Sequence, residues 1–463
     1  MNDLLTERMA RVVVDTAAVP DAVLAGAKVA LADALACGLA GSLDEGSEIV
    51  LRWVNETGGK PQAAVWGSAV RTSAAEAALA NGTYMHALDF DDTLPTQRGH
   101  PSSTLVPVVM AVGEVAGSSG REALTAFALG LEVAGVLGRA FGNGHYLHGW
   151  HPTSTVGIFA ATAAAARLSG LTAQQLCRAW GIAASQASGL TRNFGTMTKP
   201  FHPGLAARGA VMSTWLARQD FTADAQIFDG KGSFLATYAG EDGKPLAGLV
   251  DELGVRWGML DPGINYKRWP CCSCNHRAIG GLLEMLAEHA IATEEVESIA
   301  VGFPPGADDA LKYDRPQTGA EGKFSIQYSV AATLLDRRIT LETYTDAMLR
   351  RPEALVLMDK VRRYKIPDDK VYSGTVGYND VELVTRRGTF KRRIDRSPGS
   401  IAWPMSAAEQ EAKFLDCAGR VLGTTGAGAL LQLVREADRL PEISALVRAT
   451  VPGAPRPAAV PVQ

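Results

Sequence analysis

The sequence predicts a mainly α-helical protein with a smaller α+β section in its second half. Apolar residues recur at helical spacing through residues 1–220, and capping residues or glycine mark the ends of many of these segments. From about residue 265 the pattern changes to short strand-like runs and to helices rich in Arg and Glu. Helical spacing returns after Pro398. We therefore expect helices at both ends of the chain and a mixed section between them.

The first 220 residues are expected to be almost entirely helical. The predicted helices cover 4–15, 20–42, 105–116, 120–141, 153–168, 172–188 and 205–218. Ser73 and Glu76 have the spacing of a capping box and begin another helix, which leads into a polar motif at 86–100. Ser102 or Ser103 is expected to cap the helix that follows. The polar motifs therefore lie at turns between helices, where functional groups often gather.

The second half mixes strands and helices. We expect a strand at 296–303, helices at 325–335 and 344–364, and a hairpin formed by 381–384 and 389–394 around Arg387-Gly388. Helices return at 406–422 and 427–439, and the Pro/Ala-rich end, 452–463, is expected to be disordered.

Composition excludes several classes of protein. A chain of 463 residues can bury a large core, and its net charge of −4 gives no basic footprint for nucleic acid. The first residues do not resemble a signal peptide, and no run of about 18 uninterrupted apolar residues predicts a membrane span. Six cysteines are too few for a disulfide scaffold, so we expect a cytoplasmic protein with no membrane or nucleic-acid partner.

The motif from His86 to His100 carries three aspartates, Asp89, Asp91 and Asp92. Such a cluster can hold magnesium together with a substrate phosphate. No second acidic motif of the right kind follows it, so acid–base chemistry is the better interpretation. Asp92 can equally be a helix cap, and we expect Asp91 and Asp92 to be structural.

A second motif holds three histidines within 145–151, together with Tyr146. On one continuous helix these histidines would share a face and could bind zinc. The nearby glycines and Pro152 disfavour such a helix, so we expect a loop with one or two functional histidines, in which His148 lies at the surface. Histidine titrates near pH ~6.5 and suits proton transfer.

Two further motifs surround Lys199 and His276. Lys199 lies just before a predicted helix start, where its ammonium could face an anion. Cys271 and Cys274, with His276, have the spacing of half a zinc site, but a structural site needs a second pair. We therefore predict no metal here.

Taken together, these motifs resemble the MmgE/PrpD family. The resemblance lies in Asp89-Phe-Asp-Asp-Thr93, Gly99-His-Pro-Ser102, His151-Pro-Thr153, Thr198-Lys-Pro200, Trp269-Pro-Cys with His276, and Phe324-Ser-Ile-Gln-Tyr328. It implies a large helical domain from both chain ends, 1–262 and 398–451, and a smaller inserted α+β lid domain, 263–397. It also implies a homodimer.

The resemblance further implies a site for a small di- or tricarboxylate. The expected catalytic residues are Asp89, His100, Tyr146, His151 and Lys199, and the expected substrate-binding residues are Thr93, Arg98, His276 and Tyr328. Asp89 would orient a histidine and raise its pKa. Neither a metal nor another cofactor is expected. The implied activity is that of a lyase, a dehydratase or decarboxylase that transfers a proton at the carbon α to a carboxylate. An epimerase of an iminodisuccinate-like substrate, with Tyr146 and Lys199 opposed, is the alternative.

Overall fold

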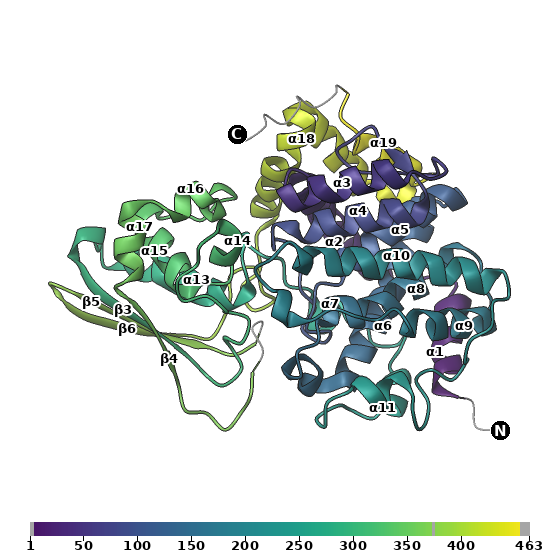
Figure 1. Ribbon diagram of the computed structural model, residues 1–463, viewed down its shortest axis with the longest axis horizontal. Coiled ribbons are helices and arrows are strands. Elements are labelled where there is room, and N and C mark those ends of the chain that lie inside the picture. Colours follow the sequence, from purple (N-terminus) through teal and green to yellow (C-terminus); the bar gives the residue numbers. More distant parts are fainter. Residues whose placement is uncertain (1–3, 373–375, 454–463) are drawn as a thin grey trace.

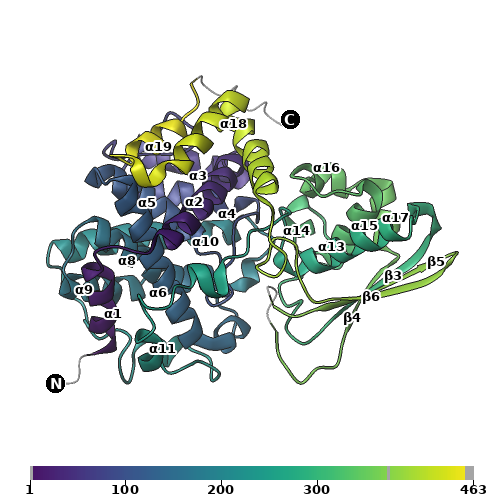
Figure 2. The same ribbon diagram turned by 180° about the vertical axis from the view of Figure 1, so that it is seen from behind.

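The computed structural model describes residues 4–372 and 376–453 and confirms a mainly α fold with an α+β part. Figure 1 shows a broad helical body on the right and the smaller mixed part on the left, and Figure 2 shows the same arrangement from behind. The predicted tail at 452–463 falls almost wholly outside the described residues.

The helical body is built mainly from the first 260 residues. Its helices of ten residues or more are α1 (Leu5–Asp15), α2 (Asp21–Gly41), α3 (Glu45–Thr57), α4 (Ala74–Ala87), α5 (Ser102–Ala116), α6 (Gly120–Leu147), α8 (Gly157–Leu168), α9 (Ala173–Ala184) and α10 (Thr198–Arg218). Shorter elements complete it: β1 (Ala63–Ala64), β2 (Arg71–Thr72), α7 (Pro152–Thr155), α11 (Phe234–Tyr238) and α12 (Leu246–Val250). α4 and α10 pack closely because Gly82 and Gly204 face each other, and a methyl group on Gly82 would lie 2.9 Å from the Cα of Gly204.

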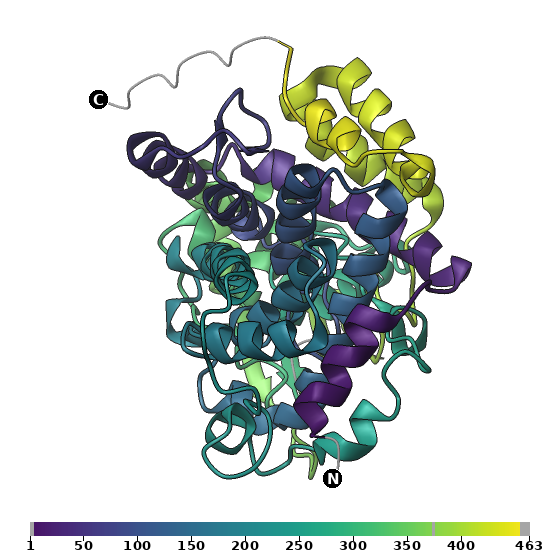
Figure 3. The ribbon, with the colours of Figure 1, turned by 90° about the vertical axis from the view of Figure 1, so that its right-hand side faces the viewer.

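The chain returns to this body at its C-terminal end. Helix α18 (Ala407–Arg435) packs along α2, and α19 (Ser444–Ala449) packs against α5 and α18. Figure 3 shows these yellow helices at the top of the body beside the purple N-terminal helices. Gly423 interrupts α18 with a φ of 69°, where the sequence predicts a break between two helices.

The smaller part contains a four-stranded sheet covered by helices. Its strands are β3 (Val296–Phe303), β4 (Val361–Lys365), β5 (Asn379–Thr385) and β6 (Gly388–Ile394), and its main helices are α13 (Ser273–Glu288), α15 (Ile326–Asp336) and α17 (Pro352–Met358). The strand order is β4-β3-β5-β6, with β3 and β4 parallel and the other pairs antiparallel. Alternate residues of β5 are buried, so one face of the sheet packs against α13.

Buried apolar side chains form two clusters. The larger one takes residues from 9–264 and from 414–447, and the smaller takes Phe194 and residues from 269–394. This grouping agrees with a helical body made of both chain ends. The domain limits at 262/263 and 397/398 remain a prediction.

Several local predictions are wrong. The helix expected over 344–364 is two short helices, α16 (Asp346–Leu349) and α17, followed by strand β4. α6 does not end at 141 but continues to Leu147 past a break at Gly142, so His145 is helical. α5 starts at Ser102 without a side-chain cap, and α10 starts at Thr198, which places Lys199 in its first turn. Tertiary packing of these segments outweighed the local signals.

Two helices, α2 and α6, are long and apolar enough to cross a membrane by length and composition alone. Their apolar windows are 61% and 89% buried inside the protein, as in core helices. The expectation of a protein without a membrane partner stays a prediction.

Candidate active site

The candidate site lies where the two parts meet, around the loop that joins α4 to α5. This loop is tied to the segment after α12 by a pair of backbone hydrogen bonds between Thr93 and Asn265. Asp89 and Arg98 in this loop adopt left-handed conformations, with φ values of 52° and 55°. Such conformations are unfavourable for residues other than glycine and often occur at functional sites.

A cavity of about 70 Å³ opens beside this loop. The predicted site residues that line it are Asp89, Thr93, Arg98, His100, Tyr146, His151 and Lys199. The smaller part supplies the facing wall with residues such as Cys272, Ser273, Ala310 and Phe324. The structure therefore brings seven of the nine predicted residues together.

Asp89 is the anionic centre of the cavity. Its Oδ1 accepts hydrogen bonds from Lys199 Nζ at 2.9 Å and from Lys267 Nζ at 2.7 Å. Burial alone would raise the pKa of Asp89, but the two ammonium groups hold this pKa well below its usual range. The same carboxylate, together with Asp91, keeps the pKa of Lys267 above its ordinary value although burial would lower it.

Asp91 forms a hydrogen bond with His86 and lies close to His100. Its carboxylate lies 2.9 Å from Nδ1 of His86 and 3.4 Å from Nδ1 of His100. Nε2 of His86 lies 2.8 Å from Lys199 Nζ, so a neutral His86 can donate to Asp91 and accept from Lys199. Burial lowers the pKa of His86 to about 3, which agrees with this neutral tautomer.

His100 is placed to act as a base. Burial lowers its pKa, although Asp91 opposes the shift, so the ring is neutral near pH 7. Its Nδ1 lies 3.4 Å from the Asp91 carboxylate but has no hydrogen-bond partner among the described residues, and its Nε2 lies 3.9 Å from Asp89 Oδ1 in the wall of the cavity. That Asp89 orients or charges a histidine stays a prediction, since Asp89 Oδ1 is itself within ion-pair distance of His100. Asp91, expected to be structural, lies closer to the His100 ring than Asp89 does.

Asp92 does serve the structural role predicted for it. It accepts a hydrogen bond from the Ser102 hydroxyl at 2.6 Å and a longer one from the Ser102 backbone at the start of α5. Burial raises its pKa to about 8.

His151 closes another side of the cavity. It is buried, lies before α7, and has Nδ1 at 3.1 Å from Nδ1 of His202. Burial first, and then Lys199, holds the pKa of His151 well below its usual value, so this pair is neutral. His145 instead bonds to Tyr238 and Thr155 away from the cavity.

The remaining lining residues offer neutral donors and a cation. Burial raises the pKa of Tyr146 well above its ordinary value, so its hydroxyl stays protonated. Thr93 accepts a long hydrogen bond of 3.4 Å from the Asn265 amide at Oγ1. Arg98 adds a third cationic side chain to those of Lys199 and Lys267. His148 is exposed, as expected.

Two predicted substrate-binding residues lie elsewhere. Tyr328 is completely buried among the apolar residues of the smaller part, and its hydroxyl donates to the carbonyl oxygen of Thr343. His276 lines a separate small cavity of about 20 Å³ beside Thr93, with Nε2 3.3 Å from the Cys271 carbonyl oxygen. A motif places a residue near a site along the chain, but the packing of α13 and α15 decides where its side chain points.

The sequence did not single out His86, Lys267 or the aromatic residues around Lys199. Lys199 Nζ lies 5.1 Å from the ring centre of Phe194 and 5.2 Å from that of Phe324, which come from different parts of the fold. His86 stands at the start of the predicted motif, and Lys267 stands next to the cysteine turn. Their position in these motifs is the only signal that could have identified them.

The cysteines form no disulfide, and all six are buried free thiols. Cys272 and Cys274 line the cavity, whereas Cys271 lies in the core of the smaller part. The prediction of no metal remains untested. His86, Asp89, Asp91 and His100 bring one possible ligand atom each within 4.8 Å of one another, but lysine ammonium groups already balance Asp89.

Comparisons with known proteins agree with this arrangement. The MmgE/PrpD N-terminal domain matches residues 7–246, and the MmgE/PrpD C-terminal domain matches residues 269–439. The human protein named cis-aconitate decarboxylase is 28% identical over 438 residues, which cover 92% of this chain and 90% of the human one. The mouse protein of the same name is 28% identical over 447 residues (92% and 89% coverage), and the one from Aspergillus terreus is 24% identical over 451 residues (93% and 92%). The chain thus belongs to the MmgE/PrpD family.

Proposed function

We propose that this protein is a lyase that decarboxylates a small tricarboxylate of the cis-aconitate type, by proton transfer at a carbon next to a carboxylate and without a cofactor. The names of the relatives support a lyase of the decarboxylase or dehydratase type. The observation that carries the proposal is the neutral His100, with the Asp91 carboxylate 3.4 Å from its Nδ1, in the wall of a cationic cavity.

The charges of the cavity suit a polyanion. Arg98, Lys199 and Lys267 stand against a single lining carboxylate, that of Asp89. Lys199 and Lys267 are buried, so water screens them little, and their attraction for a carboxylate is stronger than on the surface. Both ammonium groups are already positioned by Asp89, so they need little reorganisation to meet a substrate.

The chemistry needs an acid at carbon and a sink for negative charge. When the C–C bond to the departing carboxylate breaks, CO₂ leaves and its bonding electron pair spreads over the remaining unsaturated carboxylate. Lys199 and Lys267 stabilise that charge. A bound polyanion raises the pKa of His100, which lets this residue bind a proton and deliver it to carbon.

The cavity is small for such a substrate. Its volume of about 70 Å³ is below the roughly 300 Å³ at which ligand pockets usually begin. The wall that carries Cys272, Ser273 and Phe324 belongs to the smaller part, so we expect this part to move outward for entry and to close over the substrate. Small-angle scattering with and without a non-reactive tricarboxylate would detect that movement.

The test is an incubation in D₂O with separate samples of cis-aconitate, 2-methylcitrate and iminodisuccinate, followed by NMR and CO₂ measurement. CO₂ release from cis-aconitate with one deuterium in the product supports the proposal. Loss of water from 2-methylcitrate without CO₂ release would instead indicate a dehydratase. No reaction with any of the three would refute the proposed class.

An epimerase is the second candidate, because Tyr146 lines the same cavity as Lys199 and could exchange a proton on the other side of a carbon. Deuterium exchange into iminodisuccinate without a net loss of mass, abolished by Tyr146→Phe, would favour the epimerase.

A further inference from the structure

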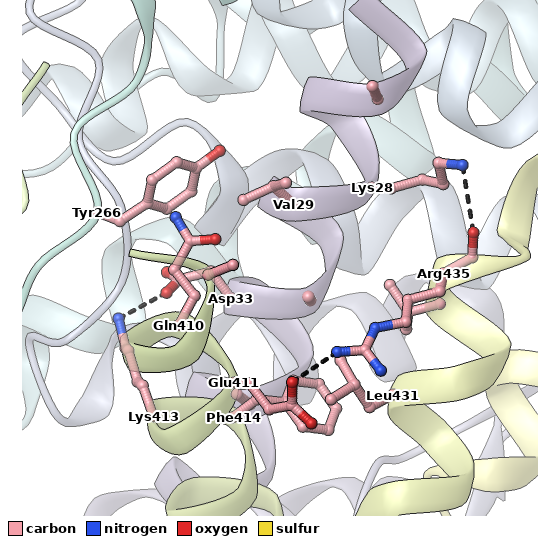
Figure 4. A pocket seen from close by; sticks show the side chains of 15 residues that line it. Lys28, Val29, Asp33, Tyr266, Gln410, Glu411, Lys413, Phe414, Leu431 and Arg435 are labelled. Carbon is pink, nitrogen blue, oxygen red and sulfur yellow. Dashed lines mark hydrogen bonds and ion pairs between the residues drawn. The ribbon is translucent and has the colours of Figure 1, made fainter. Parts of the chain in front are cut away.

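A larger cavity of about 320 Å³ lies between α2 and α18 and shares no lining residue with the catalytic cavity. Figure 4 shows it between the purple helix α2 and the yellow helix α18. Much of its wall is apolar, with small residues such as Ala32 on α2 and with Phe414 and Leu431 on α18. Its edge is open to solvent, since Val29 is 36% exposed. A dry cavity of half this size holds a benzene ring, so this one has room for about two rings.

Every charged side chain of this cavity already has a partner of opposite charge. Lys28 pairs with Asp438 at 2.8 Å, Arg435 with Glu411 at 2.8 Å, and Lys413 with Asp33 at 2.6 Å. A charged ligand would have to separate one of these pairs or leave its own charge uncompensated. The cavity therefore suits an uncharged molecule.

Among the described residues, two polar groups of the lining have no hydrogen-bond partner. They are the Tyr266 hydroxyl and the Gln410 carboxamide, and both residues are half-buried. Figure 4 shows both at the same side of the cavity, with the Tyr266 hydroxyl directed towards Val29 on α2. They offer donors and acceptors to a ligand that carries a single hydrogen-bonding group on an apolar body.

The floor of this cavity is connected to the catalytic site. Lys413 Nζ donates to the carbonyl oxygens of Phe90 at 2.8 Å and of Lys267 at 3.0 Å. Phe90 follows Asp89, and Lys267 holds the Asp89 carboxylate. One buried ammonium group thus joins α18, α2 and the two segments that position Asp89.

We propose that the cavity between α2 and α18 is an effector site for an uncharged, mainly apolar molecule of about two rings with one hydrogen-bonding group. Its occupant covers Lys413 and Asp33 and thereby reduces the mobility of the backbone at Phe90 and Lys267. The proposal does not depend on the reaction assigned to the catalytic cavity.

6-Propionyl-2-(dimethylamino)naphthalene is a suitable probe, because it is uncharged, has two fused rings, changes its fluorescence in apolar surroundings and carries one carbonyl oxygen as a hydrogen-bond acceptor. We expect saturable binding of one probe per chain to the wild-type protein. Ala32→Phe fills the cavity and should weaken binding at least about tenfold, which corresponds to about 1.4 kcal/mol. Ala22→Phe, on an exposed position of the same helix outside the cavity, is the matched control and should bind as the wild type does.

Ala25→Phe, at the exposed rim, gives a second filling variant should Ala32→Phe fail to fold. Equal probe affinity in the wild type and in the filling variants overturns the site, as does the absence of saturable binding. Hydrogen–deuterium exchange tests the connection. Saturating probe should slow exchange in peptides containing Phe90 and Lys267, and leave β5 and β6 unchanged. Unchanged exchange at both segments, with the probe bound, overturns the effector role.

Discussion

Replacing Lys267 by methionine tests the electrostatic design of the site without reference to any reaction. The Lys267 side chain is 3% exposed and donates to both Asp89 Oδ1 and the Asp89 carbonyl oxygen, at 2.7 and 2.8 Å. Methionine fills a similar volume but leaves the buried carboxylate with Lys199 alone. Breaking a buried ion pair by removing one partner costs roughly 3–5 kcal/mol of stability. Because Lys199 still pairs with Asp89, we expect the free energy of unfolding to fall by about 3 kcal/mol, at the lower end of this range.

The assay is urea unfolding at pH 7.5, followed by circular dichroism. The matched control is Lys391→Met, which removes an exposed lysine that pairs with Glu382 at 3.0 Å and is 69% exposed. Because water screens that pair, its loss should cost less than about 1 kcal/mol. Equal unfolding midpoints for the two variants would refute the reasoning.

The same comparison has a predicted pH dependence. The pKa of Asp89 is held well below its unfolded value of about 3.9, so its contribution to stability is present above pH ~4 and is lost as the pH falls further. Removing Lys267 reduces this depression of the pKa. The difference in the free energy of unfolding between wild type and Lys267→Met should therefore be largest at neutral pH and should become smaller below pH ~4. A difference that grows in acid would contradict this account.

Three further predictions concern single side chains. His100→Gln should lower kcat by about 10² to 10⁴-fold on whichever substrate is turned over, with the fold intact by circular dichroism, and activity within twofold of wild type would exclude His100 as the proton carrier. Tyr328→Phe should lower the free energy of unfolding by about 1–2 kcal/mol, because it leaves the Thr343 carbonyl oxygen unpaired. Its kcat should stay near that of the wild type, and a large loss of kcat in a stable variant would show that Tyr328 acts in the site. The pKa of His86 is about 3 in the folded protein and about 6.5 in the unfolded chain, so the free energy of unfolding should fall as the pH drops from 6.5 to 5. His86→Asn should reduce this pH dependence of the melting temperature. An equal pH dependence in the variant and the wild type would show that His86 is not its cause.

The motifs that line the candidate site could be predicted because their residues are adjacent in the chain. Asp89, Thr93 and His100 share one loop, so any fold that buries this loop between helices brings them together. Strand β3 and the β5–β6 hairpin could be predicted as well, since alternation and a turn at Arg387-Gly388 are local signals.

Predictions failed where a choice depended on distant partners. The sequence could not say which aspartate pairs with the lysines and which with His86, because Asp89 and Asp91 are equivalent in type and differ only in the side chains that contact them. Asp89 forms ion pairs with Lys199 from α10 and with Lys267 from the segment before α13. The Asp91 carboxylate instead lies beside the histidine rings.

By itself, the sequence determined the helical class, the mixed section between the helices and most of the predicted residues that line the candidate site. Tertiary structure alone decided that Tyr328 lies in a core, that Lys267 enters the site, and that Lys413 joins the catalytic loop to a second cavity. The physical reason is that helix and strand formation depends on neighbours along the chain. The charge state and direction of a buried side chain depend on groups that only folding brings within a few ångströms.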